Sequence, residues 1–108
     1  MRRSLTVIAG LALLVLPFVA VAGETTVKVS HSKLKPAEVT IGVGDKVNFV
    51  HTVVMLPGGH VLAADDGSFK GEPLVMPGST WPRTFDMAGT FPYRILQHPG
   101  VRGTITVK

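Results

Sequence analysis

The feature of this sequence that most restricts its fold is a succession of short segments in which apolar residues alternate with polar ones. Each segment is ended by glycine, proline or another turn-forming residue, and none shows sustained helical periodicity. The segments that read as strands are residues 25–30, 39–43, 46–54, 60–64, 73–76, 80–85, 90–96 and 103–107. Many short strands with frequent turns predict an all-β domain, an antiparallel sandwich or barrel, and leave its topology open.

The first 22 residues have the pattern of a secretory signal peptide. Arg2 and Arg3 give a positive start, an apolar run follows, and Ala20-Val21-Ala22 forms a small-residue cleavage site. We therefore expect residues 1–22 to be a signal peptide and residues 23–108 to be one mature domain. The protein is expected to be periplasmic or secreted, without a membrane span after cleavage. An uncleaved anchor is the alternative.

The charge of the mature chain is too small to indicate a nucleic-acid partner. The formal charge of +4 includes two arginines of the signal. Residues 23–108 contain nine Lys and Arg against seven Asp and Glu, a net charge of +2, and the basic residues are scattered.

The chain has no cysteine. Small exported domains often depend on disulfides because their cores are small. This domain must be held together by sheet packing, with a bound metal as a further possible source of stability. The absence of thiols also excludes a cysteine nucleophile and a cysteine-based zinc site.

Four segments of the mature chain carry motifs that occur in the same order in a known family of proteins. They are LKPAEVTI (34–41) with GDKVNF (44–49), HVLAADDGSF (60–69), PGSTWPRTF (77–85) and GTFPYRILQHPGVRGTITV (89–107). Together they resemble the cupredoxins, the small copper proteins of the plastocyanin, amicyanin and pseudoazurin type. The resemblance covers essentially the whole mature chain and implies a Greek-key β-sandwich of about seven to eight strands.

The resemblance also implies a metal site, in which His60 and His98 match the two histidine ligands of the family. The family's cysteine and methionine ligands are missing, because Ile95 and Val101 stand in their places. The segment between Phe49 and His60 is a few residues longer than the family pattern. Imidazole nitrogens suit copper, zinc and nickel, so two facing histidines can still hold a metal.

Two further histidines are expected near the same end of the sandwich. His51 stands where the family usually has an asparagine, and it either supplies a third imidazole ligand or takes over the hydrogen bonds of that asparagine. His31 lies in the loop after the first expected strand, and we expect it to be a weak or peripheral ligand. The alternative for His60 and His98 is that both are surface histidines of a sandwich that has lost its metal.

The resemblance implies an exported copper-binding protein that holds Cu(II), with Cu(I) as a further state, in a histidine-rich site without cysteine. Its role would be copper binding, delivery or tolerance, with a copper-accepting or redox protein as partner. The alternatives are electron transfer by an atypical copper site and a metal-free module that binds a protein. We do not expect an enzyme, since the sequence shows no paired carboxylates, Ser/His/Asp set or phosphate-binding glycine loop.

Overall fold

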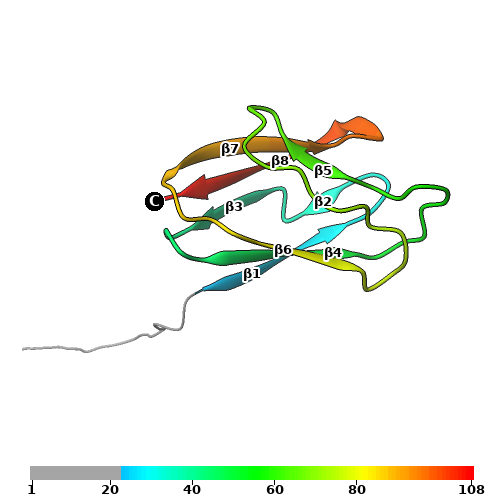
Figure 1. The fold of residues 1–108 in the computed structure, drawn as a ribbon, viewed down its shortest axis with the longest axis horizontal. Coiled ribbons are helices and arrows are strands. Elements are labelled where there is room, and N and C mark those ends of the chain that lie inside the picture. Colours follow the sequence, from blue (N-terminus) through cyan, green and yellow to red (C-terminus); the bar gives the residue numbers. More distant parts are fainter. Residues whose placement is uncertain (1–22) are drawn as a thin grey trace, which may run out of the picture.

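The computed structural model describes residues 23–108, and the expected signal peptide lies outside the described residues. These residues form a β-sandwich (Figure 1). The eight strands are β1 (Glu24–Val29), β2 (Leu34–Lys35), β3 (Glu38–Ile41), β4 (Lys46–His51), β5 (Leu62–Ala64), β6 (Thr80–Thr84), β7 (Gly89–Ile95) and β8 (His98–Val107). The prediction of an all-β domain of seven to eight strands is confirmed.

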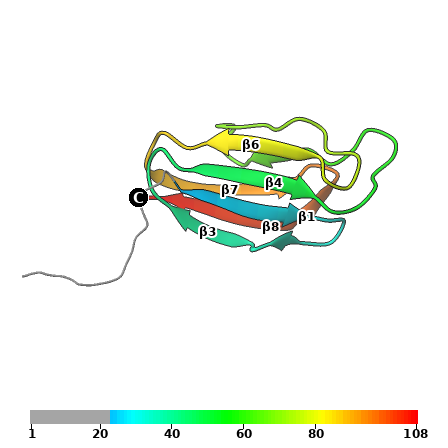
Figure 2. The ribbon, with the colours of Figure 1, turned by 90° about the horizontal axis from the view of Figure 1, so that it is seen from below.

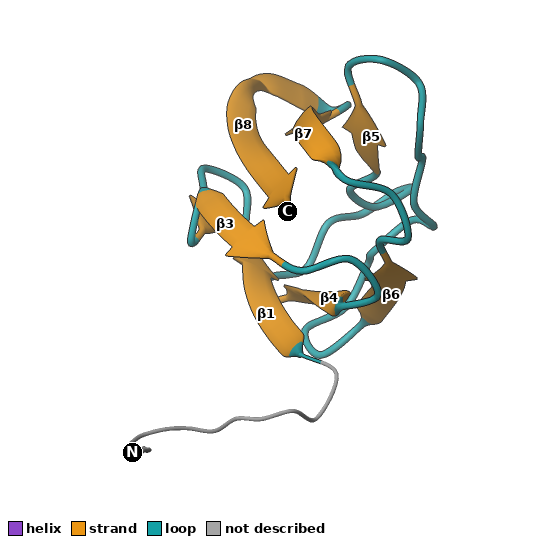
Figure 3. Ribbon diagram, turned by 90° about the vertical axis from the view of Figure 1, so that its left-hand side faces the viewer, coloured by secondary structure: helices purple, strands orange, loops and turns teal. Residues whose placement is uncertain are grey.

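The strands form two four-stranded sheets, with the orders β2-β1-β4-β6 and β3-β8-β7-β5. Figure 2 shows the strands running along the length of the domain, and Figure 3 shows the two sheets on opposite sides of the core. Among the described residues no helix is present that would be long and apolar enough to span a bilayer.

Of the expected antiparallel sandwich or barrel, the sandwich is confirmed, but the antiparallel direction is wrong for two strand pairs. β1 pairs with β4 in parallel, and β3 pairs with β8 in parallel, so both sheets are mixed. The alternation of side chains along a strand has the same period in both kinds of pair, so the sequence pattern could not distinguish them. The parallel pairing of β1 and β4 has a direct consequence for the site, because the C-terminal ends of both strands then lie at the same end of the sandwich.

Residues 73–76, which were expected to form a brief strand, form only an isolated bridge between Leu74 and His60. A strand is hard to sustain there because Pro73 and Pro77 lack the N–H groups that a ladder needs. The segment nevertheless has a role, since the bridge fixes the backbone of His60.

The core lies between the sheets and is made of the inward-facing residues of alternating strands. Its fully buried side chains include Val27, Phe49, Tyr93 and Ile105. In β4 the residues Val47, Phe49 and His51 all face inward, because they alternate along one strand. A histidine is thereby carried on the core face at the end of a strand, where its side chain is 1% exposed.

Candidate metal centre

His60 is held by a backbone bridge on one side and by a glycine turn before it. Its N–H donates to the carbonyl of Leu74 over 2.9 Å, and the N–H of Leu74 donates back over 2.8 Å. Gly59 precedes it with a φ of +80°, a conformation that side chains disfavour. A Cβ on Gly59 would lie 2.8 Å from the Leu74 carbonyl oxygen, so this position requires glycine. The His60 side chain is thus fixed and fully buried.

His98 is the first residue of β8 and lies directly across a tight hairpin from Ile95, the last residue of β7. The register is irregular at this point, since Arg94 pairs with Arg102 while Ile95 pairs with His98. Residues 99–101 are therefore left without partners on β7 and form a bulge. The bulge allows His98 to stay paired at the end of the strand while the rest of β8 keeps its register.

The hairpin turn is joined to the segment that carries His60. The N–H of Leu96 donates to the carbonyl of Val61, and the N–H of Val61 donates to Oε1 of Gln97, each over 2.8 Å. Because Val61 follows His60 and Gln97 precedes His98, these hydrogen bonds set the two histidine-bearing segments beside each other.

His31 lies in the short turn that joins β1 to β2. The N–H of Ser30 donates to the Lys33 carbonyl over 3.1 Å, and the N–H of Lys33 donates to the Ser30 hydroxyl oxygen over 3.3 Å. His31 stands at the tip of this closed turn and is exposed.

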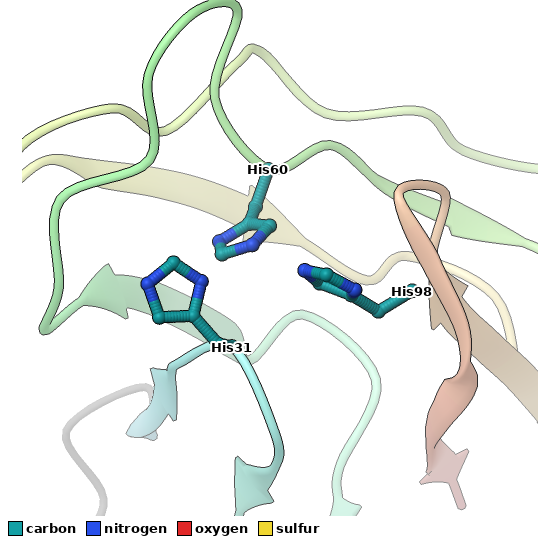
Figure 4. Close-up of side chains that lie close together, drawn as sticks. All are labelled: His31, His60 and His98. Atoms are coloured by element: carbon teal, nitrogen blue, oxygen red, sulfur yellow. The ribbon is translucent and has the colours of Figure 1, made fainter.

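The side chains of His31, His60 and His98 form one cluster. Each offers a ring nitrogen, and the three nitrogens lie within 4.8 Å of one another. The ring centroids of His60 are 5.0 Å from His31 and 5.1 Å from His98. Figure 4 shows the three rings, from three separate segments of the chain, turned toward one another. The sequence predicted that His60 and His98 would meet at one end of the fold, and the structure brings them together.

His51 lies behind this cluster rather than within it. Its Nε2 atom is 2.8 Å from Nδ1 of His60, a hydrogen bond between two buried rings. The three-histidine cluster consists of His31, His60 and His98. His31, which was expected to be a weak or peripheral ligand, is therefore a member of the cluster, and His51, for which a third-ligand role was considered, is not. His31 points to the shared space and His51 contacts His60 from the core side.

Burial and mutual repulsion keep the buried rings neutral. Burial, as the main cause, and the charges of the neighbouring histidines together lower the pKa of His60 to about 4. Burial also lowers the pKa of His51, an effect that the Met76 backbone opposes. A neutral imidazole keeps a lone pair for a metal, so His60 stays available as a donor in mildly acidic conditions.

The donor set fits a metal that accepts imidazole nitrogen. Nε2 of His60 and Nε2 of His98 are both buried without a hydrogen-bond partner. Two donor atoms on one ion lie at most about 4 Å apart, because each metal–imidazole bond is about 2 Å long. The three ring nitrogens, which lie within 4.8 Å of one another, are already close to that separation. A blue copper donor set does not fit, since Ile95 is fully buried and has no donor atom.

The acidic residues of the described part do not complete the cluster, which contains histidine alone. Asp65 is the nearest acidic residue in sequence to His60, and it is paired with Arg94 over 3.0 Å and with Arg102. The cluster therefore offers a bound metal imidazole nitrogens and no carboxylate oxygen from the described residues.

Sequence reasoning did not identify the residues that position the ligands. Gly59 and Gln97 each act on a histidine next to them in the chain. The Gly58-Gly59 pair directly before His60 was a usable signal, because two glycines at one turn often mark conformations closed to other residues. Nothing in the sequence indicated the hydrogen bond between Gln97 and Val61, which joins segments 36 positions apart.

Comparisons with known proteins find a relative in sequence and solved structures of the same fold. Amicyanin from Paracoccus denitrificans is 29% identical over 88 residues, which cover 80% of this chain and 66% of that protein. The chain thus spans just under two thirds of the length of this curated relative. No protein-family model matches the chain.

Solved structures of amicyanins have the same fold. The amicyanin of Paracoccus versutus superimposes with a TM-score of 0.64 at 27% identity, covering 82% of this chain and 85% of that one. A reduced Cu(I) form of an amicyanin variant superimposes with a TM-score of 0.62 at 28% identity, covering 83% and 86%. The chain therefore has the cupredoxin fold and resembles amicyanin in sequence, and it contains isoleucine and valine at the positions that the resemblance assigns to cysteine and methionine ligands.

Proposed function

We propose that this chain is an exported copper-binding protein that holds Cu(II) through His31, His60 and His98. The observation that carries the proposal is the cluster itself, in which three imidazoles from separate segments each offer a nitrogen within 4.8 Å of the others. Two of these rings have a buried Nε2 atom without any partner. Buried polar atoms are rarely left unsatisfied, so a ligand that satisfies them is expected.

Copper is the metal that this donor set favours among the common divalent ions. At a nitrogen site copper binds more tightly than zinc, nickel or cobalt. The comparisons support the same metal, since the amicyanins with the same fold include reduced Cu(I) forms. A bound copper ion would supply a redox-active Lewis acid, while the protein contributes neutral imidazoles on rigid segments.

Binding, delivery or tolerance of copper suits the site better than fast electron transfer. Fast electron-transfer copper sites use a cysteine thiolate with a weak axial methionine. This chain has no cysteine, and Ile95 is packed into the core in its place. A site of imidazoles alone prefers Cu(II) and reorganises more on reduction. The protein would then act in the periplasm or outside the cell and exchange copper with a partner protein.

Titration of residues 23–108 with Cu(II), followed by electron paramagnetic resonance, tests the proposal. We expect one equivalent to bind with a nitrogen-rich spectrum that lacks the narrow copper splitting of a thiolate site. His60→Ala and His98→Ala should each weaken binding at least tenfold, and His31→Ala should weaken it less, because this donor is exposed. Ser32→Ala, in the same turn as His31, is the control and should bind like the wild type.

Electron transfer is the second candidate, because solved amicyanins include oxidised and reduced forms. Reversible voltammetry of the copper-loaded domain at a high potential would favour it over storage or delivery. A domain that takes up no copper below millimolar concentration would contradict both and leave a metal-free module that binds a protein.

A further inference from the structure

Basic residues that read as scattered along the sequence are gathered by the β1–β2 hairpin. Lys28 and Lys35 are direct partners across this antiparallel pair, and both are exposed. Their neighbours Val29 and Leu34 are also partners and are buried. Alternation therefore places the two lysines on the outer face of the sheet. Lys33, the last residue of the hydrogen-bonded turn, is exposed as well. These three residues are called the lysine patch below.

The lysine patch has no negative partner within residues 23–108. The ion pairs formed there join Asp65 to Arg94 and to Arg102. Glu24 stands at the far end of β1, and Glu38 begins β3 without an ion pair to any of the three lysines. Like charges directly opposite each other across two strands are destabilising. The folded domain therefore carries a cluster of positive charge that its own described residues do not neutralise.

The lysine patch lies beside the exposed donor of the histidine cluster. His31 stands in the same turn, two residues before Lys33. Its ring is turned toward those of His60 and His98 (Figure 4). Lys28 is three residues before His31, which corresponds to about 10 Å of extended chain. Exposed charges act on one another over roughly 10 Å at an ionic strength of about 0.1 M. A protein group that approaches His31 from solvent is therefore within reach of the patch.

The size of the patch decides among the classes of anionic partner. Basic segments that bind anionic lipid generally carry about four to eight Lys and Arg. Proteins that bind DNA tightly make about six to ten phosphate contacts. Three lysines on a mature domain with a net charge of +2 fall short of both. A protein surface with a few carboxylates matches them, because complementary local charge raises association rates by about 10- to 1000-fold.

We propose that the lysine patch is the docking surface for a copper-accepting protein whose contact face is acidic. The inference rests on the proposed copper-binding function, and it adds the charge of the partner and the place where it docks. Carboxylates of the partner would face the three lysines, and its metal-binding group would meet the ion at His31. A bound Cu(II) ion adds positive charge to the same end of the domain. The partner should therefore bind the loaded domain more tightly than the metal-free one and separate more readily after transfer.

Peptide binding to the metal-free domain tests the patch without copper. The probe is a synthetic glutamate-rich peptide, and the matching glutamine peptide is the neutral control. Nuclear magnetic resonance of the nitrogen-labelled wild-type domain reports where each peptide binds. At low ionic strength we expect the glutamate peptide to shift the amide signals of residues 28–35 most, and added salt to remove the effect. Shifts centred elsewhere, or none at all, would overturn the inference.

Two triple variants separate the patch from the net charge of the domain. The patch variant combines Lys28→Gln, Lys33→Gln and Lys35→Gln. The control variant removes the same charge from the other three lysines of the mature chain, by Lys46→Gln, Lys70→Gln and Lys108→Gln. The patch variant should bind the glutamate peptide about tenfold more weakly than the wild type, and the control variant should bind it nearly as well as the wild type. Equal losses in the two variants would refute a local docking surface.

Thermal unfolding shows whether the patch variant is folded. Its three substituted side chains are exposed, and two of them face each other as like charges. We therefore expect it to unfold at the wild-type temperature or slightly above.

Copper transfer connects the patch to the proposed function. Two acceptor peptides share the sequence Gly-Gly-His at their N-terminus, which binds Cu(II), and differ in a tail of glutamates or glutamines. The copper-loaded wild type should transfer its ion about tenfold faster to the acceptor with the glutamate tail. The patch variant should show no such preference. Equal rates to both acceptors in the wild type would contradict the proposal.

The remaining outcomes separate this inference from its alternatives. Tighter binding of the wild type to phosphatidylglycerol vesicles than to the glutamate peptide would assign the patch to a membrane and overturn the inference. Failure of the wild type to bind copper would refute the proposed function and, with it, the copper-accepting role of the partner. Copper binding without any glutamate-peptide binding at residues 28–35 would refute the docking surface alone and leave the copper site standing.

Discussion

Ile95 determines what chemistry the site can perform, because it fills the place of a ligand with a fully buried hydrocarbon side chain. It lies at the end of β7, directly across the hairpin from His98. Ile95→Cys should therefore place a thiol beside the histidine cluster. On addition of Cu(II) we expect an intense thiolate-to-copper absorption in the visible range. Ile95→Ser is the control without sulfur and should stay pale. A copper-loaded Cys variant without that band would show that residue 95 does not face the site.

Gly59 is a second residue on which the site depends. Gly59→Ala forces a Cβ to within 2.8 Å of the Leu74 carbonyl oxygen, at a φ of +80°. Gly58→Ala has a similar φ of +89° but open space around the Cβ, so it isolates the strain from the clash. We expect Gly58→Ala to cost about 1 kcal/mol of unfolding free energy, and Gly59→Ala to cost more and to weaken copper binding. Urea denaturation and copper titration of both variants measure this difference. Equal effects in the two variants would mean that the bridge to Leu74 does not constrain His60.

At the scale of single residues, the sequence identified the histidines but not their arrangement. His60 and His98 could be placed because motifs surround each of them. The roles of His31 and His51 could not be assigned in this way, because they depend on ring orientation. His51 belongs to the core face of β4 and reaches His60 from behind, whereas His31 reaches the cluster from an exposed turn. Periodicity places a residue on a face of a strand, and it carries no information on which neighbour the side chain contacts.

The β7–β8 hairpin is the element that brings His98 to His60, and it is held by the hydrogen bonds around Val61. Gln97→Ala removes the acceptor of the Val61 N–H. Because Gln97 is exposed, water can replace the lost acceptor, and we expect a loss of at most about 1 kcal/mol in unfolding free energy. Hydrogen exchange at the Val61 amide should accelerate, and copper should dissociate faster. Gln97→Glu retains an acceptor oxygen and serves as the control. An unchanged exchange rate at Val61 in the Ala variant would contradict this role.

The elements themselves were largely predictable, with errors where tertiary structure determines the boundary. Strands 80–85 and 90–96 were expected within a residue of β6 and β7. β8 was expected from residue 103 and begins at His98, because a bulge lets the strand continue past Pro99 and Gly100. Proline and glycine normally indicate the end of a strand. Here the pairing of Ile95 with His98 across the hairpin makes the strand begin at His98, and the sequence pattern does not show this pairing.

At the scale of the whole molecule, the single tyrosine gives a direct measure of core stability against alkali. Tyr93 is fully buried, and burial raises the pKa of its hydroxyl above the ordinary value. The Tyr93 hydroxyl ionises near pH 10 in the unfolded chain, whereas in the folded chain it stays neutral at that pH. Stability is therefore complete below pH 10 and falls above it, by up to about 1.4 kcal/mol per pH unit from this group. Urea denaturation from pH 8 to 11.5 measures the decline.

Tyr93→Phe should remove that part of the decline. Its hydroxyl has no hydrogen-bond partner in the described residues, so the substitution should cost little at neutral pH. A variant that loses stability in alkali as steeply as the wild type would show that other groups cause the decline.

The topology was the least predictable property of the molecule from periodicity. Alternating segments predicted strands, and only the resemblance to a known family implied a Greek-key order. The two parallel pairs join strands that are distant in sequence, β1 with β4 and β3 with β8. Such pairing is decided by which surfaces the sheets bury against each other, a property of the assembled fold that no single segment encodes.

The unequal burial of the three donors gives the cluster an inside and an outside. His60 is sealed in the core, His98 is half-buried, and His31 stands in solvent at the tip of a turn. If the cluster holds copper as proposed, a donor from another protein would displace the exposed imidazole of His31 first, while His60 and His98 still held the ion. Transfer would then exchange one metal–imidazole bond at a time. The exposed position of His31 in the β1–β2 turn would make its bond to the ion the first to be exchanged.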